Sequence, residues 1–201
     1  MTTGNLGWWL SALIVVCGCS TQTNIVAEDV RLNEISCVGV KTHTSTNAPT
    51  EFPVRVILNT NVLSEQDVEI FVESAERINS AMGQTIVTPV TNETGDDSAP
   101  NTVVMFTTAI HSGKAIGLTT HHTEGHSFVQ VETSSTVGAL MPQSFYTHEM
   151  VLEVATHEML HALGLEHEAD QGSLMASEAD PSHHAISAET VCGLAQLVLT
   201  K

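Results

Sequence analysis

The fold class that the sequence predicts is α/β or α+β, with helices layered on a sheet. The chain has 201 residues, of which 42% are apolar, so it is long enough to bury the core of one domain. Its periodic segments follow the order strand, helix, several strands, helix, helix, and no internal repeat is visible. This order predicts a single layered domain.

The boundaries of the elements follow from capping residues and turn signals. The first strand, at 52–58, opens the expected domain, which covers 51–201. Ser64 is the expected N-cap of the first helix and Gly83 its end, because a serine hydroxyl accepts backbone N–H groups and glycine tolerates a left-handed conformation. The apolar stripe of this helix is Val68, Phe71, Val72, Ala75, Ile78 and Met82. The other expected strands are 85–90, 102–108, 115–120 and 127–132, and the other helices are 147–163 and 188–199.

The charge balance excludes one class of partner. Six Lys and Arg residues face 23 Asp and Glu residues, which gives a formal net charge of −17. Nucleic-acid phosphates and anionic lipid surfaces are bound by clustered Lys and Arg, so we expect no nucleic-acid partner. The acidity fits a solvated extracellular surface or an affinity for cations. The 11 histidines are an unusual number and supply potential metal ligands.

The N-terminus predicts export. An apolar run of 11 residues at 6–16 is too short to span a bilayer as a mature helix, and small and polar residues follow it. Val16-Cys17-Gly18-Cys19 resembles the lipobox of bacterial lipoproteins, which implies that 1–18 is a signal peptide and that lipid on Cys19 anchors the protein to the membrane. Ser20 then favours the outer membrane of a Gram-negative cell envelope. The alternative is an ordinary secretory signal with incidental cysteines and a secreted product.

Residues 19–50 predict a linker, because this stretch is polar, rich in Thr, Asn and Ser, and without a clear period. If Cys17 leaves with the signal and Cys19 carries lipid, Cys37 and Cys192 remain. An even pair in an exported chain predicts a disulfide, which here would join the linker to the last helix. The competing interpretation makes Cys37 a thiolate ligand that covers a metal site.

A metal site is predicted by the segment His157-Glu158-Met159-Leu160-His161-Ala162-Leu163-Gly164-Leu165-Glu166-His167. On a helix, His157 and His161 lie on one face, one turn apart, so both imidazoles can reach one ion. Gly164 can take the positive φ that ends a helix, after which His167 can return as a third ligand. Three ligands with one open position are the catalytic arrangement of Zn²⁺, and Glu158 is placed to act on water there.

The complete pattern resembles the zinc motif of metzincin metallopeptidases, and the order of elements from residue 52 to residue 199 resembles the matrixin-like branch. Gly172-Ser173-Leu174-Met175-Ala176 resembles the Met-turn, which implies that Met175 forms an apolar floor beneath the ion. The resemblance also implies a mixed twisted sheet whose antiparallel edge strand, 115–120, pairs with an extended peptide. The chain departs from matrixins at Ala176, where they have an aromatic residue, and it has no tyrosine after the Met-turn.

These residues together predict a zinc endopeptidase acting on extracellular or envelope proteins. One Zn²⁺ held by His157, His161 and His167 would activate water, with Glu158 as the general base that takes its proton and passes it to the leaving amine. The alternative is a non-catalytic surface lipoprotein that uses the same scaffold for binding or metal capture. The intact Glu158 argues against it, because binding alone has no need of that acid.

Other histidines and acids are candidate ligands for a second metal ion. The matrixin resemblance implies a structural Zn²⁺ or Ca²⁺ near the last strand pair, with candidate ligands His111, His121, His122 and His126 for zinc and Asp96, Asp97 and Glu124 for calcium. Solvated histidines in a loop are the simpler interpretation, and the same interpretation applies to His183 and His184. His148 is expected to be exposed. Glu166 and Glu168 either tune His167 or are solvated.

Overall fold

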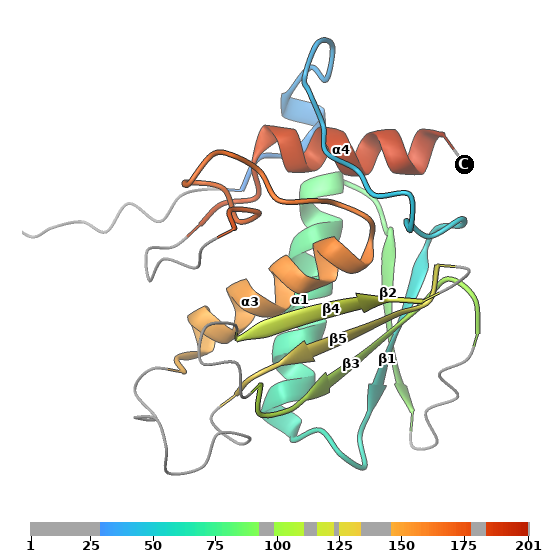
Figure 1. Cartoon of the computed structure of the whole chain (residues 1–201), viewed down its shortest axis with the longest axis vertical. Helices are drawn as coiled ribbons and strands as arrows, with labels where there is room; N and C mark the ends of the chain where they lie inside the picture. The colour runs from blue at the N-terminus through green and yellow to red at the C-terminus, as the bar shows by residue number, and fades with distance from the viewer. Residues whose placement is uncertain are drawn as a thin grey trace, which may run out of the picture.

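The computed structural model describes residues 29–92, 99–110, 116–122, 125–133, 146–177 and 184–200, which contain one five-stranded sheet (Figure 1). Its strands are β1 (Val54–Asn59), β2 (Val87–Asn92), β3 (Thr102–Thr107), β4 (Gly117–His121) and β5 (Ser127–Val131). The order across the sheet is β2-β1-β3-β5-β4, and the pairings are parallel except that of the edge strand β4 with β5. The predicted strands are therefore confirmed, with small shifts at their ends.

Three α-helices and a short 3-10 helix, Leu32–Glu34, occur in the described residues. α1 (Glu65–Met82) begins at Ser64, whose hydroxyl accepts the N–H of Asp67, and ends at Gly83, whose φ is 65°. α3 (His148–Ala162) and α4 (Ala188–Leu199) are capped by the hydroxyl groups of Thr147 and Ser187. Hydroxyl caps satisfy N–H groups that a helix leaves unpaired, which is why the predicted boundaries are confirmed to within one residue.

The helices form a layer against the sheet. α1 packs against β2, α3 packs against β4 and β5, and the two helices contact each other, while α4 lies across the end of α1 (Figure 1). Buried apolar side chains from all of these elements make one core; its members include Leu58 of β1, Phe71 of α1, Met159 of α3 and Leu194 of α4. The predicted α/β class is confirmed, and α3 is placed so that it lies along the edge strand β4.

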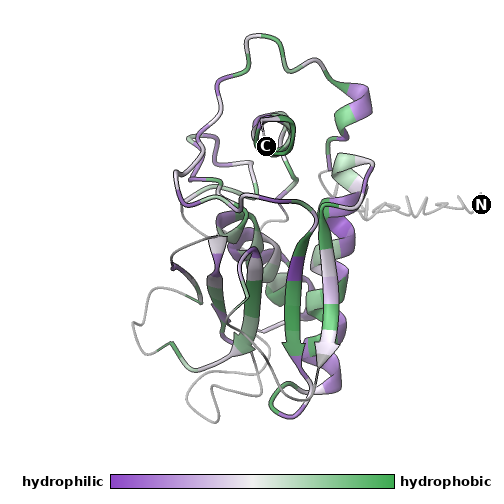
Figure 2. Ribbon diagram, turned by 90° about the vertical axis from the view of Figure 1, so that its right-hand side faces the viewer, coloured by the Kyte–Doolittle hydropathy of each residue, from purple (hydrophilic) through white to green (hydrophobic). Residues whose placement is uncertain are grey.

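The described part of the expected linker 19–50, residues 29–50, contacts the domain at several points. Figure 2 shows α4 end-on, with the chain before β1 arching around it. The predicted disulfide between Cys37 and Cys192 is present and ties the arch to α4, which excludes the thiolate interpretation of Cys37. Further along, Thr44 forms a β-bridge with Leu165 and Ala48 is buried. Hydrogen bonds such as those of Thr42 Oγ1 to Gln196 Oε1 and of the Ser45 N–H to Gly164 O fasten this polar segment to the domain.

The predicted signal peptide 1–18, Cys19 and the remainder of the linker up to residue 28 lie outside the described residues. Within the part of the chain that the structure describes, no helix is long and apolar enough to cross a membrane.

Candidate metal centre

Three histidines meet where the described residues bring α3 and the chain after it together. His157 and His161 project from the same face of α3, and Gly164, with a φ of 101°, turns the chain so that His167 returns to them. One ring nitrogen of each histidine lies within 4.8 Å of the others, as a shared ion requires. The sequence-predicted ligand set is thus brought to one place.

Hydrogen bonds fix the orientation of the two helical rings. His157 Nδ1 lies 2.7 Å from the carbonyl oxygen of Leu174, and His161 Nδ1 lies 2.8 Å from that of Leu165. A carbonyl oxygen can only accept, so both Nδ1 atoms carry the proton and both Nε2 atoms keep a free lone pair. Second hydrogen bonds of this kind are typical of metal-binding histidines.

The donor set fits zinc. His161 Nε2 and His167 Nε2 are 3.1 Å apart, and two nitrogens bound to one tetrahedral Zn²⁺ at 2.0–2.1 Å would be about 3.3 Å apart. Burial lowers the pKa of His157 and lowers that of His161 to about 4, and the neighbouring imidazoles act in the same direction. Burial therefore keeps both rings in the neutral form that binds a metal ion.

Glu158 is buried between α3 and the edge strand. Its Oε2 accepts a hydrogen bond from the Thr119 hydroxyl at 2.7 Å, and the same hydroxyl lies 2.8 Å from the Glu158 carbonyl oxygen. Burial raises the pKa of the Glu158 carboxyl to about 7, against the Thr119 hydrogen bond, which lowers it. A carboxyl group with a pKa near neutrality can both accept and release a proton.

Gly117 is what allows β4 to approach Glu158. A Cβ atom on Gly117 would lie 2.6 Å from Cγ and Oε1 of Glu158 and 2.8 Å from Cγ1 of Val154. Any larger residue would displace the carboxylate or separate the strand from the helix. The edge strand therefore sets the position of the acidic group as well as bordering the site.

The predicted Met-turn lies directly after the third histidine. Met175 is fully buried, its N–H bonds to Ser173 Oγ, and its carbonyl oxygen accepts the N–H of Glu168. The neighbouring Leu174 carbonyl is the partner of His157 Nδ1, so this turn orients one of the three histidines. That contact ties the turn to the metal centre.

A cavity of about 430 Å³ opens beside the histidines. Its walls come from β4, from α3, from the turn at 173–177 and from His184. The described lining residues other than the three histidines and Glu158 are about half apolar and half polar, a mixture that suits sites for small molecules and peptide side chains. The apolar ones are Ile116, Gly117, Leu118, Met150, Val154, Leu174 and Ala176, and the polar ones are Thr119, His121, Glu153, Ser173, Ser177 and His184.

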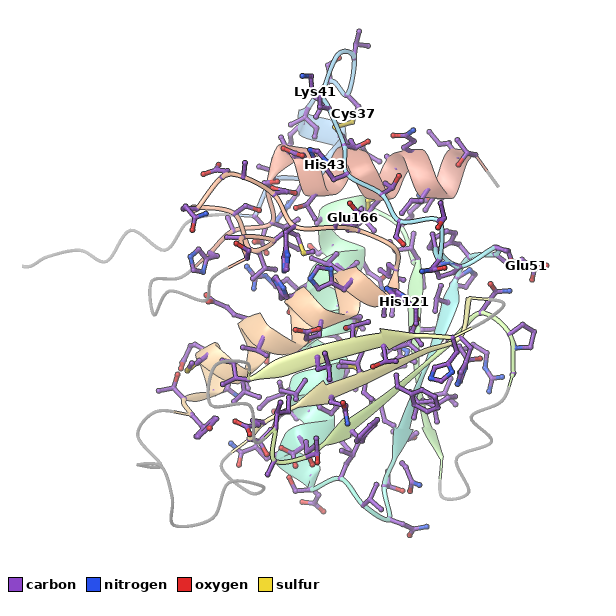
Figure 3. All side chains as sticks on the ribbon, viewed as in Figure 1. Cys37, Lys41, His43, Glu51, His121 and Glu166 are labelled. Atoms are coloured by element: carbon purple, nitrogen blue, oxygen red, sulfur yellow. A yellow bond between two sulfur atoms is a disulfide. The ribbon has the colours of Figure 1, made fainter. Side chains whose placement is uncertain are left out.

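The remaining candidate ligands do not gather into a second site in the described residues, where His157, His161 and His167 form the only group of three or more potential ligands close enough to share an ion. His121 lines the cavity at the end of β4 (Figure 3), and burial lowers its pKa. His122 and His126 instead stack edge-on against Phe128. His111, Asp96, Asp97, Glu124 and His183 lie outside the described residues.

The remaining polar residues that the sequence singled out differ in their burial. His184 is only 7% exposed, so its interpretation as a solvated loop residue is wrong. Glu168 is buried and accepts hydrogen bonds from the hydroxyl groups of Ser187 and Thr190 at the start of α4, so it is not solvated either. His148 is partly exposed and contacts Glu73 at 2.8 Å, while Glu166 is exposed (Figure 3).

Sequence reasoning missed Gly117, Thr119, Glu153 and the buried position of His184. Each acts through a partner distant in the chain, and single-sequence periodicity gives no signal for such pairs. Comparison of the sequence with protein-family models and with curated proteins finds no match, so function is inferred from the geometry of the site.

Proposed function

We propose that this protein is a zinc-dependent endopeptidase that hydrolyses peptide bonds of extracellular or envelope proteins. The observation that supports it most strongly is the convergence of three imidazoles beside a buried carboxylate in a cavity. A non-catalytic metal-binding protein would need the imidazoles but not the neighbouring acid. The resemblance of residues 157–176 to the metzincin motifs points to the same activity.

In this proposal each residue of the site has a separate task. His157, His161 and His167 would hold the ion, which supplies Lewis acidity that lowers the pKa of water to near 7 and polarises a carbonyl group. Glu158 takes a proton from the attacking water and passes it to the leaving amine. Thr119 and Gly117 keep the Glu158 carboxylate aimed at the position where water attacks.

The edge strand β4 would bind the substrate backbone. Among the described strands it pairs with β5 alone, and Leu118 in its middle is 45% exposed. An extended peptide can add to such an edge by backbone hydrogen bonds, which would present its scissile bond to Glu158. Residues on either side of that bond would then lie against the cavity.

The proposed location is the cell envelope, with lipid on Cys19 as the anchor, or the extracellular space if the signal is an ordinary one. Labelling of cells with a radioactive fatty acid, with Cys19→Ala as the control, separates the lipid-anchored protein from the secreted one. The Cys37–Cys192 disulfide supports an oxidising compartment.

Metal content and cleavage measured on the same sample test the enzymatic proposal. We expect one tightly bound zinc per chain and cleavage of an unfolded protein such as casein, lost on removal of the metal by a chelator and restored by zinc. Several weak equivalents without cleavage would instead support metal capture. One tight zinc without cleavage of any peptide would leave the scaffold a binding protein.

A further inference from the structure

His184 is held in place more firmly than its position in a loop requires. Its backbone N–H donates to Glu153 Oε1 at 3.1 Å, and its carbonyl oxygen accepts from the Arg77 guanidinium at 2.8 Å. Arg77 is in turn paired through two nitrogens with Asp29. Both backbone groups of His184 are therefore fixed, and the ring has little freedom to move.

The ring of His184 has one unsatisfied atom. Its Nδ1 faces Glu153 Oε2 at 3.6 Å, whereas its Nε2 is buried and has no hydrogen-bond partner among the described residues. A buried polar atom without a partner costs free energy, so the contacts of His184 with Glu153 and Arg77 have to hold the ring in this position.

Glu153 and His184 both line the cavity. Glu153 is one helical turn before His157 on the same face of α3, about 6 Å along the helix axis. A peptide whose scissile bond lies beside Glu158 would place one flanking side chain in the cavity, where Val154 and Met150 of α3 supply apolar lining. The tip of a long side chain would then reach Glu153.

The charged group at this part of the cavity is an acceptor. It is the Glu153 carboxylate, and no Lys or Arg is among the described residues that line the cavity. Lys and Arg side chains carry donors only, along with a long apolar stem that suits the walls. An acidic side chain would meet a like charge and would be rejected.

Resting on the proposed peptidase function, we propose that Glu153 and His184 form a specificity site that selects substrates with Lys or Arg beside the scissile bond. The stem of that residue packs against Val154 and Met150. Its charged group pairs with the Glu153 carboxylate, which the His184 N–H holds in place.

A peptide library varied at both positions flanking the cleaved bond tests this selection with the zinc-loaded protein. We expect Lys and Arg to be enriched at one position, and kcat/KM for a Lys peptide to exceed that of its norleucine counterpart at least about tenfold. Glu153→Gln keeps an oxygen that accepts the His184 N–H but removes the charge. It should reduce the ratio of the two kcat/KM values about tenfold, with the norleucine peptide changed less than about threefold.

Glu149→Gln is the matched control, because Glu149 is an exposed acid one turn earlier on α3 that does not line the cavity. It changes the net charge by the same amount and should leave the Lys-to-norleucine ratio unchanged. If Glu153 and His184 only fasten the loop, Glu153→Gln will slow both peptides equally. An unchanged ratio, or no preference in the unaltered protein, overturns the proposal.

Binding separates this inference from the proposed function. The Glu158→Gln protein, loaded with zinc, should bind the intact Lys peptide at least about tenfold more tightly than the norleucine peptide in calorimetry, and Glu153→Gln in that background should remove the difference. Preferential binding with no cleavage by the unaltered protein would refute the peptidase and keep the specificity site. Cleavage with equal binding of both peptides would support the peptidase and refute the specificity site.

Discussion

The two sides of the candidate metal centre are built in different ways. On the helix side, His157, Glu158 and His161 are within five residues of each other on α3, and their positions follow from helical spacing. On the loop side, His167 is exposed and follows a segment held by the N-terminal arch: Ser45 N–H bonds to Gly164 O at 2.7 Å, and Glu166 N–H to His43 O at 2.9 Å. Figure 3 shows His43 and Glu166 on these two segments.

Substitutions on the two sides of the site should therefore have different effects. The helix side carries the proposed base and two ligands in one contiguous motif, so a substitution there should change the chemistry and leave the fold intact. The loop side positions one ligand through contacts with residues more than a hundred positions earlier in the chain. A substitution there should change stability and metal affinity together.

The largest expected effect lies on the helix side. Glu158→Gln preserves the shape of the side chain and its contact with Thr119 but cannot take a proton from water. Turnover should fall about 10²- to 10⁴-fold, with zinc content and thermal midpoint unchanged. Peptide cleavage and metal analysis of one preparation measure both quantities. A variant that still turns over at the original rate refutes the role of Glu158.

Removing the disulfide should have the next largest effect, and on the loop side. The Cys37→Ser/Cys192→Ser protein loses a bond that closes a loop with a sequence separation of 155. The chain-entropy model gives a loss of about 3–5 kcal/mol in the free energy of unfolding, measured by urea titration. Zinc affinity should also fall, because the arch supports the segment before His167. Reduced stability with unchanged zinc affinity would show that the arch does not position this ligand.

Two glycines provide a matched test of the contact between arch and loop. Gly164 and Gly83 both have positive φ, but a Cβ on Gly164 would lie 2.4 Å from the Cβ of Ala48, while one on Gly83 meets nothing within 4 Å. Gly83→Ala should cost about 1 kcal/mol from backbone strain alone. Gly164→Ala adds overpacking and should cost about 2–4 kcal/mol. Equal losses in urea titration would show that Ala48 yields freely.

The smallest expected effect concerns the hydrogen bond from β4 to the proposed base. Thr119→Val removes the hydroxyl that binds Glu158 Oε2 but keeps the shape of the side chain. kcat/KM should fall about tenfold, as for loss of one hydrogen bond to a charged group, without loss of zinc. Thr119→Ser restores the hydroxyl and should recover most of the rate. If both variants lose the same activity, packing and not the hydrogen bond is responsible.

Features that depend on neighbouring residues in the chain could be predicted from the sequence. Helix ends follow from local caps such as Ser64 and Gly83, and the three histidines follow from helical spacing plus a glycine turn. The disulfide was predictable because an even pair of cysteines was left over in an exported chain.

Features that depend on tertiary contacts were not predictable. The segment 29–50 is polar and lacks a period, yet its backbone pairs with Leu165 and its neighbours. His184 is buried because Glu153 and Arg77 satisfy its backbone, and neither residue is near it in the sequence. Nothing in the sequence around Gly117 indicates that the Glu158 carboxylate lies against it.

The attachment of Asp29 to Arg77 and to the Ile186 N–H has a consequence for the range over which the protein works. If Cys19 carries lipid, only nine residues lie between it and Asp29, which is fixed to the domain, and this span of ten peptide units extends to at most about 35 Å. A linker free as far as residue 50 would have allowed about 110 Å. Substrates would therefore have to lie close to the membrane surface, and proteins farther from the membrane would be out of reach.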